Sequence, residues 1–137
     1  MDTSFWAGIE FLRIITSPEF SEAPTSTVLF SSVSALTADK GKTVYASAKS
    51  AMNGAVSSLA QELSAGGHRV NSILPGWVDT PLTREIAAMN DTAGVLAGHL
   101  LGKGKPEYIS QSVMFLLSND SCGINGKSFV VDGGYSA

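Results

Sequence analysis

The sequence predicts an α/β fold in which helices cover a parallel sheet. Segments with helical periodicity alternate with short β-rich runs, and this alternation is typical of parallel βαβ units. In chain order the expected elements are a helix at 3–16, a strand at 26–31, a helix at 44–65, a strand at 70–74, a helix that begins at 103–107 and a strand at 128–131. Ligands in such sheets bind outside the carboxyl ends of the strands. Residues that directly follow a strand are therefore the first candidates for a site.

The first helix is predicted from apolar residues at helical spacing. These are Phe5, Trp6, Ile9, Leu12 and Ile15, with Asp2, Thr3 and Ser4 as suitable capping residues. Pro18 ends the segment, and a polar loop leads into the β-rich run at 26–31.

The second helix, at 44–65, carries a longer apolar stripe, formed by Met52, Val56, Leu59, Ala60 and Leu63. Gly66 and Gly67 are a typical helix stop. His68 then reads as a solvated loop residue, and the strand at 70–74 follows it.

The remaining segments differ in how strongly they are patterned. Residues 80–101 are mixed in composition and are expected to form one or two loosely packed helices that could serve as a mobile lid. The last helix is expected to have a largely buried body made of Ile109, Val113, Phe115, Leu116 and Leu117. A turn at 123–126 precedes the final strand.

Composition places the chain among globular proteins of single-domain size. It has 137 residues, 44% hydrophobic and 15% charged, with a net charge of -3 and a pI near 5.2. This balance gives no electrostatic footprint for nucleic acid or for an anionic membrane. The single cysteine, Cys122, cannot form an internal disulfide and is expected to be a small packing residue. No leader peptide is recognisable and no apolar run approaches about 18 residues, so we expect a cytoplasmic protein.

The strongest chemical signal is the pair Tyr45 and Lys49. Residues four apart lie on one face of a helix, and a nearby cation favours the ionised form of a phenol. Tyr45 would then act as a general acid or base. Taken alone, a Tyr and a Lys at this spacing are better explained as ordinary helix surface, because short patterns recur by accident.

Two further motifs, one on each side of this pair in the sequence, strengthen the interpretation of Tyr45 and Lys49 as a functional pair. Ser32 follows the strand at 26–31, thirteen residues before Tyr45, and Pro75 and Gly76 follow the strand at 70–74, with Thr80 four residues after Gly76. Together these motifs resemble the short-chain dehydrogenase/reductase family, whose pattern is a strand-end Ser, Tyr-x-x-x-Lys and Pro-Gly-x-x-x-Thr. A Gly-Lys-Pro-Glu run and a later Val-Asp-Gly-Gly run also resemble that family, so the resemblance covers nearly the whole chain.

The resemblance implies a Rossmann-like, doubly wound parallel sheet and hydride transfer between NAD or NADP and a carbonyl or alcohol carbon. The implied catalytic residues are Ser32, which would hold the substrate oxygen, Tyr45, which would pass the proton, and Lys49. The implied cofactor-binding residues are Tyr45, Lys49, Pro75, Gly76, Val78 and Thr80. The implied substrate contacts are Ser32, Ser34, Tyr45 and Trp77, with Ala35 and Leu36 as further possibilities. No metal is required, since a Ser and a Tyr already polarise the carbonyl.

The family's first half is not recognisable in residues 1–25. There is no glycine-rich phosphate loop, no Asn-Asn-Ala-Gly motif, and Met1 or Asp2 stands where the family has an asparagine. We therefore expect residues 1–137 to be one partial domain, the catalytic half, holding about three strands of the sheet.

Two functional alternatives remain open from the sequence. The chain could be an oxidoreductase of this family, or a non-catalytic piece that acts, if at all, through association with another chain, since its sheet would have an open edge. A homo-oligomer through the helices at 3–16 and 44–65 is expected in either case. The substrate, the reaction direction and the choice between NAD and NADP are not readable.

Overall fold

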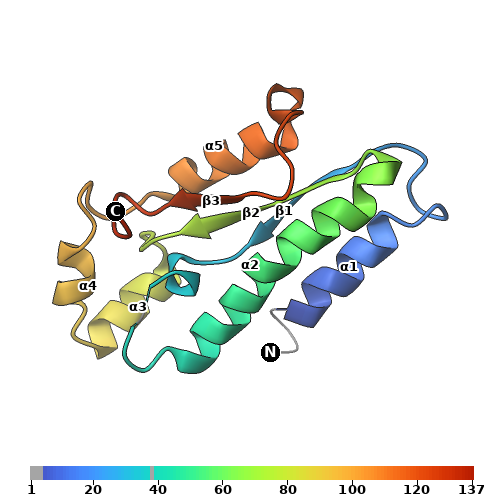
Figure 1. Cartoon of the computed structure of the whole chain (residues 1–137). Helices are drawn as coiled ribbons and strands as arrows, with labels where there is room; N and C mark the ends of the chain where they lie inside the picture. The colour runs from blue at the N-terminus through green and yellow to red at the C-terminus, as the bar shows by residue number, and fades with distance from the viewer. Residues whose placement is uncertain (1–4, 38) are drawn as a thin grey trace.

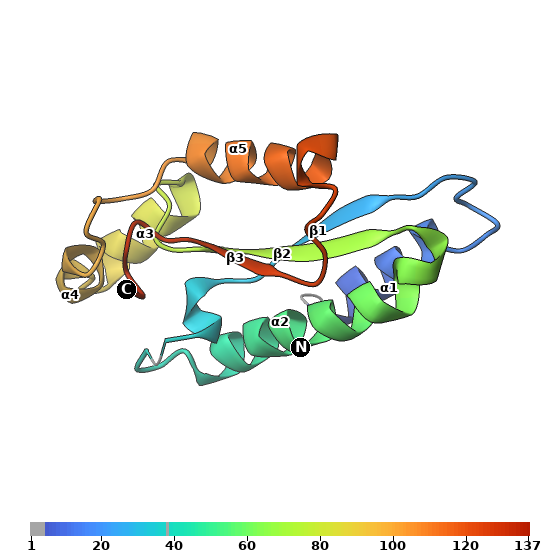
Figure 2. The same cartoon turned by 45° about the horizontal axis from the view of Figure 1, so that its top comes forward.

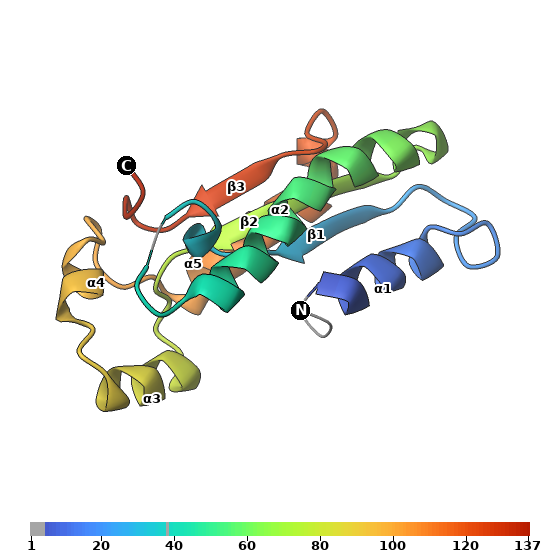
Figure 3. The same ribbon diagram turned by 60° about the horizontal axis from the view of Figure 1, so that its bottom comes forward.

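Three parallel strands form one sheet in the order β1-β2-β3. The computed structural model describes residues 5–37 and 39–137. β1 spans Ser26–Phe30, β2 spans Arg69–Pro75 and β3 spans Ser128–Val131, with β2 in the middle (Figure 3). These strands agree with the predicted ones to within a residue or so, and the predicted α/β class is confirmed.

Helices cover both faces of this sheet. α1 (Ala7–Ile15) and α2 (Thr43–Leu63) lie on one face and α5 (Pro106–Leu117) lies on the other, so the molecule has three layers (Figure 2). α3 (Pro81–Met89) and α4 (Ala93–Ala97) lie beyond the carboxyl ends of the strands (Figure 1). One or two helices were expected within 80–101, and the structure has two there. The capping residues expected at 2–4 lie outside the described residues.

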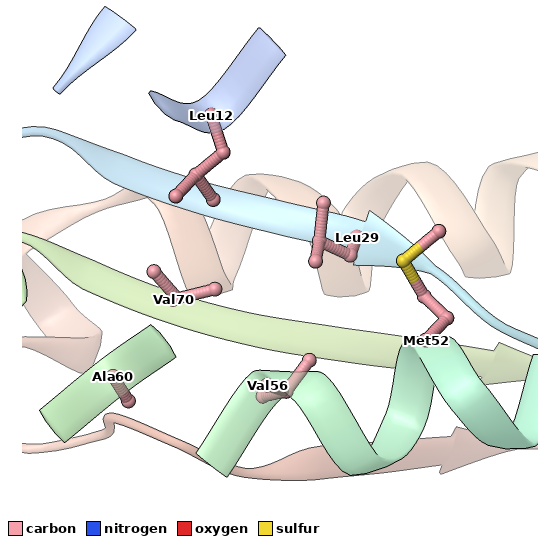
Figure 4. Packing of buried hydrophobic residues seen from close by; sticks show 6 residues of the cluster. All are labelled: Leu12, Leu29, Met52, Val56, Ala60 and Val70. Atoms are coloured by element: carbon pink, nitrogen blue, oxygen red, sulfur yellow. The ribbon is translucent and has the colours of Figure 1, made fainter. Parts of the chain in front are cut away.

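The main core lies between the sheet and the α1–α2 layer. It consists of Leu12, Leu29, Met52, Val56, Ala60 and Val70, which come from α1, β1, α2 and β2 (Figure 4). The stripe predicted on α2 is confirmed, with Leu59 and Leu63 packed at its margin. Burying one such aliphatic side chain contributes about 1.5–3 kcal/mol, so this cluster fixes α2 against the strands.

Three burial expectations were wrong. On α5, Ile109 and Leu116 are buried, but Phe115 and Leu117 are each 42% exposed, because a helix on one face of a sheet turns only one stripe toward it. Cys122 is exposed rather than packed. His68 is buried rather than solvated.

Side chain to backbone hydrogen bonds fasten the amino ends of the strands. The Arg69 guanidinium donates to the carbonyl oxygens of Leu116 and Ser118, at 3.0 and 3.1 Å, and to that of Ile124 at 3.0 Å. Nδ1 of His68 accepts a 3.1 Å bond from the backbone N–H of Thr25. Arg69 therefore caps the carbonyl end of α5 and ties it to the central strand.

Among the described residues both edges of the sheet are unpaired, one at β1 and one at β3. Within residues 5–37 and 39–137, β1 pairs with β2 alone, and its last residue, Phe30, is 51% exposed. None of the helices described is both long and apolar enough to cross a membrane.

Candidate active site

A cavity of about 280 Å³ lies at the carboxyl ends of β1 and β2. All four residues expected to contact a substrate, namely Ser32, Ser34, Tyr45 and Trp77, line it. They come from three segments: the loop after β1, the first turn of α2 and the segment after β2. Ala35 and Leu36 take no part in the wall, and Leu36 is 55% exposed. The edge of the sheet where the sequence predicts a site thus holds a real concave surface.

Ser32 is fixed by the short helix that follows it. It is the N-cap of η2 (Val33–Ala35), with extended backbone, and its Oγ accepts a 3.2 Å bond from the backbone N–H of Ser34. The side chain is buried. Because a hydroxyl both donates and accepts, the proton on Oγ is still free to reach a ligand in the cavity.

Tyr45 and Lys49 lie next to each other on α2. The Nζ atom of Lys49 is 5.8 Å from the centre of the Tyr45 ring and donates a 2.8 Å bond to the carbonyl of Phe30. The hydroxyl of Ser31 returns a 2.9 Å bond to the backbone carbonyl of Lys49. These two reciprocal bonds fix the register of α2 against the end of β1, and so place Tyr45 relative to Ser32.

Lys49 keeps donor capacity after its bond to Phe30. An ammonium has three N–H donors, and in the part of the chain that the structure describes the Phe30 carbonyl is the one acceptor recorded for Nζ. Two donors therefore remain for hydroxyl groups of a ligand. The residue Tyr45 is 49% exposed and lines the cavity, so its side chain is also accessible to a ligand.

The segment after β2 separates two cavities. Gly76 and Trp77 line the cavity described above, whereas Pro75, Val78 and Thr80 line a second one of about 450 Å³ on the α5 side. The second cavity is almost entirely apolar, with walls that include Phe30, Ile109 and Met114. The expected cofactor residues after β2 are thus divided between the two cavities.

Thr80 also has a structural role. It is the N-cap of α3, and its Oγ1 accepts a 3.3 Å bond from the backbone N–H of Thr83, while its own N–H donates to Oγ1 of Thr83 at 2.9 Å. This capping box would fix the start of α3 with or without a ligand.

Gly76 is required by the packing of the chain itself. A Cβ atom there would lie 2.7 Å from Nε2 of His99 and 2.8 Å from Cα of Asp132. The sequence left open whether this glycine gives a ligand access or makes a turn. The contacts show a third reason for a glycine at this position: the segments that carry His99 and Asp132 pack too closely against it to leave room for a side chain.

A network that the sequence did not predict completes the wall. The Asp39 carboxylate accepts hydrogen bonds from Nζ of Lys42 at 2.8 Å and from the Tyr135 hydroxyl at 3.0 Å, and His99 stacks on the Tyr135 ring with centroids 4.5 Å apart. The bond from Lys42 holds the pKa of Asp39 below its usual value, against the opposing effect of burial. Burial, and then Asp39, raises the pKa of Tyr135. Asp39, Lys42, His99 and Tyr135 all line the cavity.

Nothing in the local sequence signals this network, because Asp39 and Tyr135 are 96 residues apart. No group of three or more potential metal-ligating side chains occurs among residues 5–37 and 39–137.

Comparison with known proteins identifies the family of the chain. The family model described as enoyl-(acyl carrier protein) reductase matches residues 1–136. A cyclopentanol dehydrogenase from a Comamonas strain is 37% identical over 109 residues, which are 78% of this chain and 44% of that protein. The 3-oxoacyl-(acyl-carrier-protein) reductase FabG of Chlamydia muridarum is 33% identical over 135 residues, 98% of this chain and 54% of the relative. The chain thus spans about half the length of the curated relatives it matches.

The chain also resembles solved structures of dehydrogenases and reductases. A short-chain type dehydrogenase/reductase from Mycobacterium ulcerans superposes with a TM-score of 0.90 at 29% identity, covering 98% of this chain and 50% of that one. A 4-hydroxyisoleucine dehydrogenase solved in complex with NADH also gives a TM-score of 0.90 at 29% identity, covering 98% of this chain and 57% of its own. With the family match over nearly the whole chain, these likenesses show that the chain belongs to the short-chain dehydrogenase/reductase family.

Proposed function

We propose that residues 1–137 form the catalytic half of an NAD- or NADP-dependent oxidoreductase that interconverts a carbonyl and an alcohol. The observation that carries the proposal is that Ser32 and Tyr45 line one cavity, with the ammonium of Lys49 beside the Tyr45 ring. The named relatives, which are dehydrogenases and reductases, support it.

In this mechanism three side chains act on the substrate oxygen and its proton. Ser32 donates a hydrogen bond to the substrate oxygen, and Tyr45 gives its phenolic proton to that oxygen during reduction or takes it during oxidation. Lys49 stabilises the phenolate that remains, because an opposite charge within a few ångströms favours the ionised form. General acid–base transfer of this kind contributes about 10²–10⁴-fold to the rate.

The residues near the strand ends fit a nicotinamide cofactor, which would supply or accept the hydride. The two remaining Lys49 donors and the Tyr45 hydroxyl suit the hydroxyl groups of a ribose. Pro75 and Val78 present apolar surface to a flat ring, and the Thr80 hydroxyl provides a polar atom beside them. Gly76 contributes backbone, since its packing excludes a side chain.

The test is binding and turnover by the purified 137-residue chain. Calorimetry with NADH and NADPH measures binding, and absorbance at the nicotinamide band measures turnover of a cyclic ketone, chosen because one relative is named a cyclopentanol dehydrogenase. We expect Tyr45→Phe to lower turnover by at least about a hundredfold with cofactor binding retained. We expect Lys49→Met to weaken cofactor binding as well.

Tyr108 and Lys105 on and beside α5 offer a matched control. Their ring and ammonium lie 6.0 Å apart, and Tyr108 is 50% exposed, so they match the Tyr45–Lys49 pair in separation and exposure without lining the Ser32 cavity. Tyr108→Phe should leave turnover unchanged. Equal losses in Tyr45→Phe and Tyr108→Phe, or no cofactor binding by the folded chain, would count against the proposal.

A second candidate function is association with another chain. The open edge of β1 and the exposed Phe30 favour it, because an unpaired strand edge is a template for pairing. For a homo-oligomer, we propose the outer faces of α1 and α2, which expose Phe11, Ile14 and Val44. Sedimentation of the chain and of a Phe11→Glu variant tests this, since a dimer through α1 should dissociate in the variant and a monomeric parent would exclude it.

A further inference from the structure

The cavity next to Ser32 and Tyr45 contains a balanced pair of charges. Of the described residues that line it, Asp39 and Lys42 are the two that carry a full charge at neutral pH. They bond to each other at 2.8 Å, with their side chains 15% and 38% exposed. Nε2 of His99 accepts a 2.8 Å bond from the backbone N–H of Trp77, so this ring nitrogen is already occupied. The side chains that line the cavity therefore offer a ligand no net charge, and the Lys49 ammonium lies behind the Tyr45 ring, outside the lining.

The pair is also fixed in place. One oxygen of Asp39 accepts the bond from Tyr135 at 3.0 Å, and the other faces Lys42 and, at 3.5 Å, the hydroxyl of Ser34. Tyr135 is itself stacked on His99. Because partners on both sides hold the carboxylate, Asp39 cannot turn away and release the ammonium of Lys42 to an incoming anion.

The size of the cavity limits what can enter. At about 280 Å³ it is roughly twice the volume of a cavity that accommodates benzene, about 150 Å³. Val33, Ile86, Val95 and Trp77 supply apolar surface around it. The space suits a substrate of about one substituted ring.

We propose that the Asp39–Lys42 pair makes this cavity select small neutral ring ketones and alcohols over the same molecules carrying a carboxylate. The inference rests on the proposed function, of which it specifies the substrate class. A carboxylate would lose its hydrating water on entering the cavity. Because Lys42 is already paired with Asp39, no new ion pair would offset the free-energy cost of that desolvation.

The test uses two ligands that differ by one carboxylate, cyclohexanone and 4-oxocyclohexanecarboxylate. The chain has two tryptophans, and Trp6→Phe leaves Trp77 in the cavity wall as the fluorescent reporter. In this background the chain should bind cyclohexanone at least about tenfold more tightly than the keto acid. This readout needs neither cofactor nor turnover.

Asp39→Asn is the decisive variant. The amide keeps an oxygen to accept from Tyr135 but removes the charge that neutralises Lys42. The keto acid should then bind about tenfold more tightly, while cyclohexanone binding changes by less than about twofold; a Coulomb term discounted for the partial exposure of Lys42 has this size. Lys42→Met should act in the opposite direction and weaken the keto acid alone, because Asp39 would repel it.

Matched controls carry the same charge changes elsewhere. Lys40→Met alters an exposed lysine two residues from Lys42 and outside the cavity wall, and Asp120→Asn alters an exposed carboxylate in η4 (Asn119–Ser121). Both should leave the selectivity unchanged. Equal effects of Lys40→Met and Lys42→Met would overturn the inference, as would an Asp39→Asn chain that gains no affinity for the keto acid.

The experiments distinguish failure of the proposed oxidoreductase function from failure of the proposed selectivity for neutral ligands. Ring-ketone binding with the predicted selectivity but no turnover would remove the proposed reaction and keep the selectivity. Turnover with no discrimination between ketone and keto acid would remove the selectivity and keep the reaction. A folded chain that binds neither ligand would overturn the inference, because the cavity would not be a ligand site.

Discussion

His99 and Trp77 are joined by a 2.8 Å hydrogen bond in which the backbone N–H of Trp77 donates to Nε2 of the imidazole. The other ring nitrogen, Nδ1, faces the carbonyl oxygen of Val95 at 2.8 Å and donates to it, since a carbonyl can only accept. With the stacking on Tyr135, one buried side chain connects α4, the segment after β2 and the C-terminal segment.

Replacing His99 by alanine should destabilise the chain by about 2 kcal/mol. The change leaves the Trp77 N–H without its acceptor and removes the ring that packs on Tyr135. Urea unfolding followed by circular dichroism measures the loss. Leu101→Ala, at a site 86% exposed in the same connection, is the control and should cost less than about 0.5 kcal/mol. Equal effects would show that the His99 contacts do not stabilise the fold.

Gly76→Ala should be among the most damaging small substitutions. The added methyl would meet His99 and the backbone of Asp132 at under 3 Å, so two segments must move apart. We expect a loss of about 1–3 kcal/mol in thermal or urea unfolding. Gly54→Ala in α2 is the opposite case. Among the described residues, no atom beyond the helix's own backbone lies within 4 Å of the added methyl, and the helix should gain about 0.5–1 kcal/mol. A Gly76→Ala chain as stable as the parent would contradict the packing described.

Val56→Ala should cost about 1–3 kcal/mol, because Val56 is fully buried between α2 and the sheet. Val44→Ala makes the same change on the same helix at a side chain 75% exposed. It should be nearly neutral, since alanine also favours the helix. Urea midpoints of the two variants, compared directly, measure the contribution of burial. Similar midpoints would contradict the core assignment.

Acidification should lower the free energy of unfolding, because protonation of Asp132 weakens the hydrogen bonds that hold the C-terminal turn. Burial alone would raise the pKa of Asp132, but bonds from the hydroxyl and N–H of Ser136 and from the N–H of Gly134 outweigh it and hold the pKa below its usual value. A group whose pKa is lower when folded contributes stability above its unfolded pKa, about 3.9, and loses it as the pH falls through the folded pKa. Asp39 acts in the same direction.

The measurement is the free energy of unfolding from about pH 7 down to about pH 2 for the parent and for Asp132→Asn. The variant should be less stable at neutral pH and should lose less on acidification. Asp120→Asn, at an exposed carboxylate in η4, is the control and should keep the parent's acid dependence. A parent whose stability is flat across this range would contradict the assignment.

The sequence was sufficient for the parts of the molecule that depend on local pattern. The β-rich runs, the stripe at Met52, Val56 and Ala60, and the neighbours Tyr45 and Lys49 follow from periods of two and 3.6 residues. Parallel strands then bring Ser32 and Trp77 to one edge.

Local pattern could not give contacts between distant segments. The bond between Tyr135 and Asp39 and the closeness of Gly76 to His99 depend on how the C-terminal turn and the α4 connection fold back over the strand ends. His68 was misjudged for the same reason, since its partner Thr25 is 43 residues away. Such residues carry no signature until the chain is folded.

Arg69 donates and His68 accepts hydrogen bonds at the amino ends of the strands, and these bonds affect which substitutions the protein can tolerate. They anchor the sheet to backbone atoms, which every substitution elsewhere leaves in place. The opposite end, with Trp77, α3 and α4, can then accumulate substitutions while the anchored end stays folded. Libraries that randomise only the carboxyl end should therefore yield new specificities without a matching loss of expression.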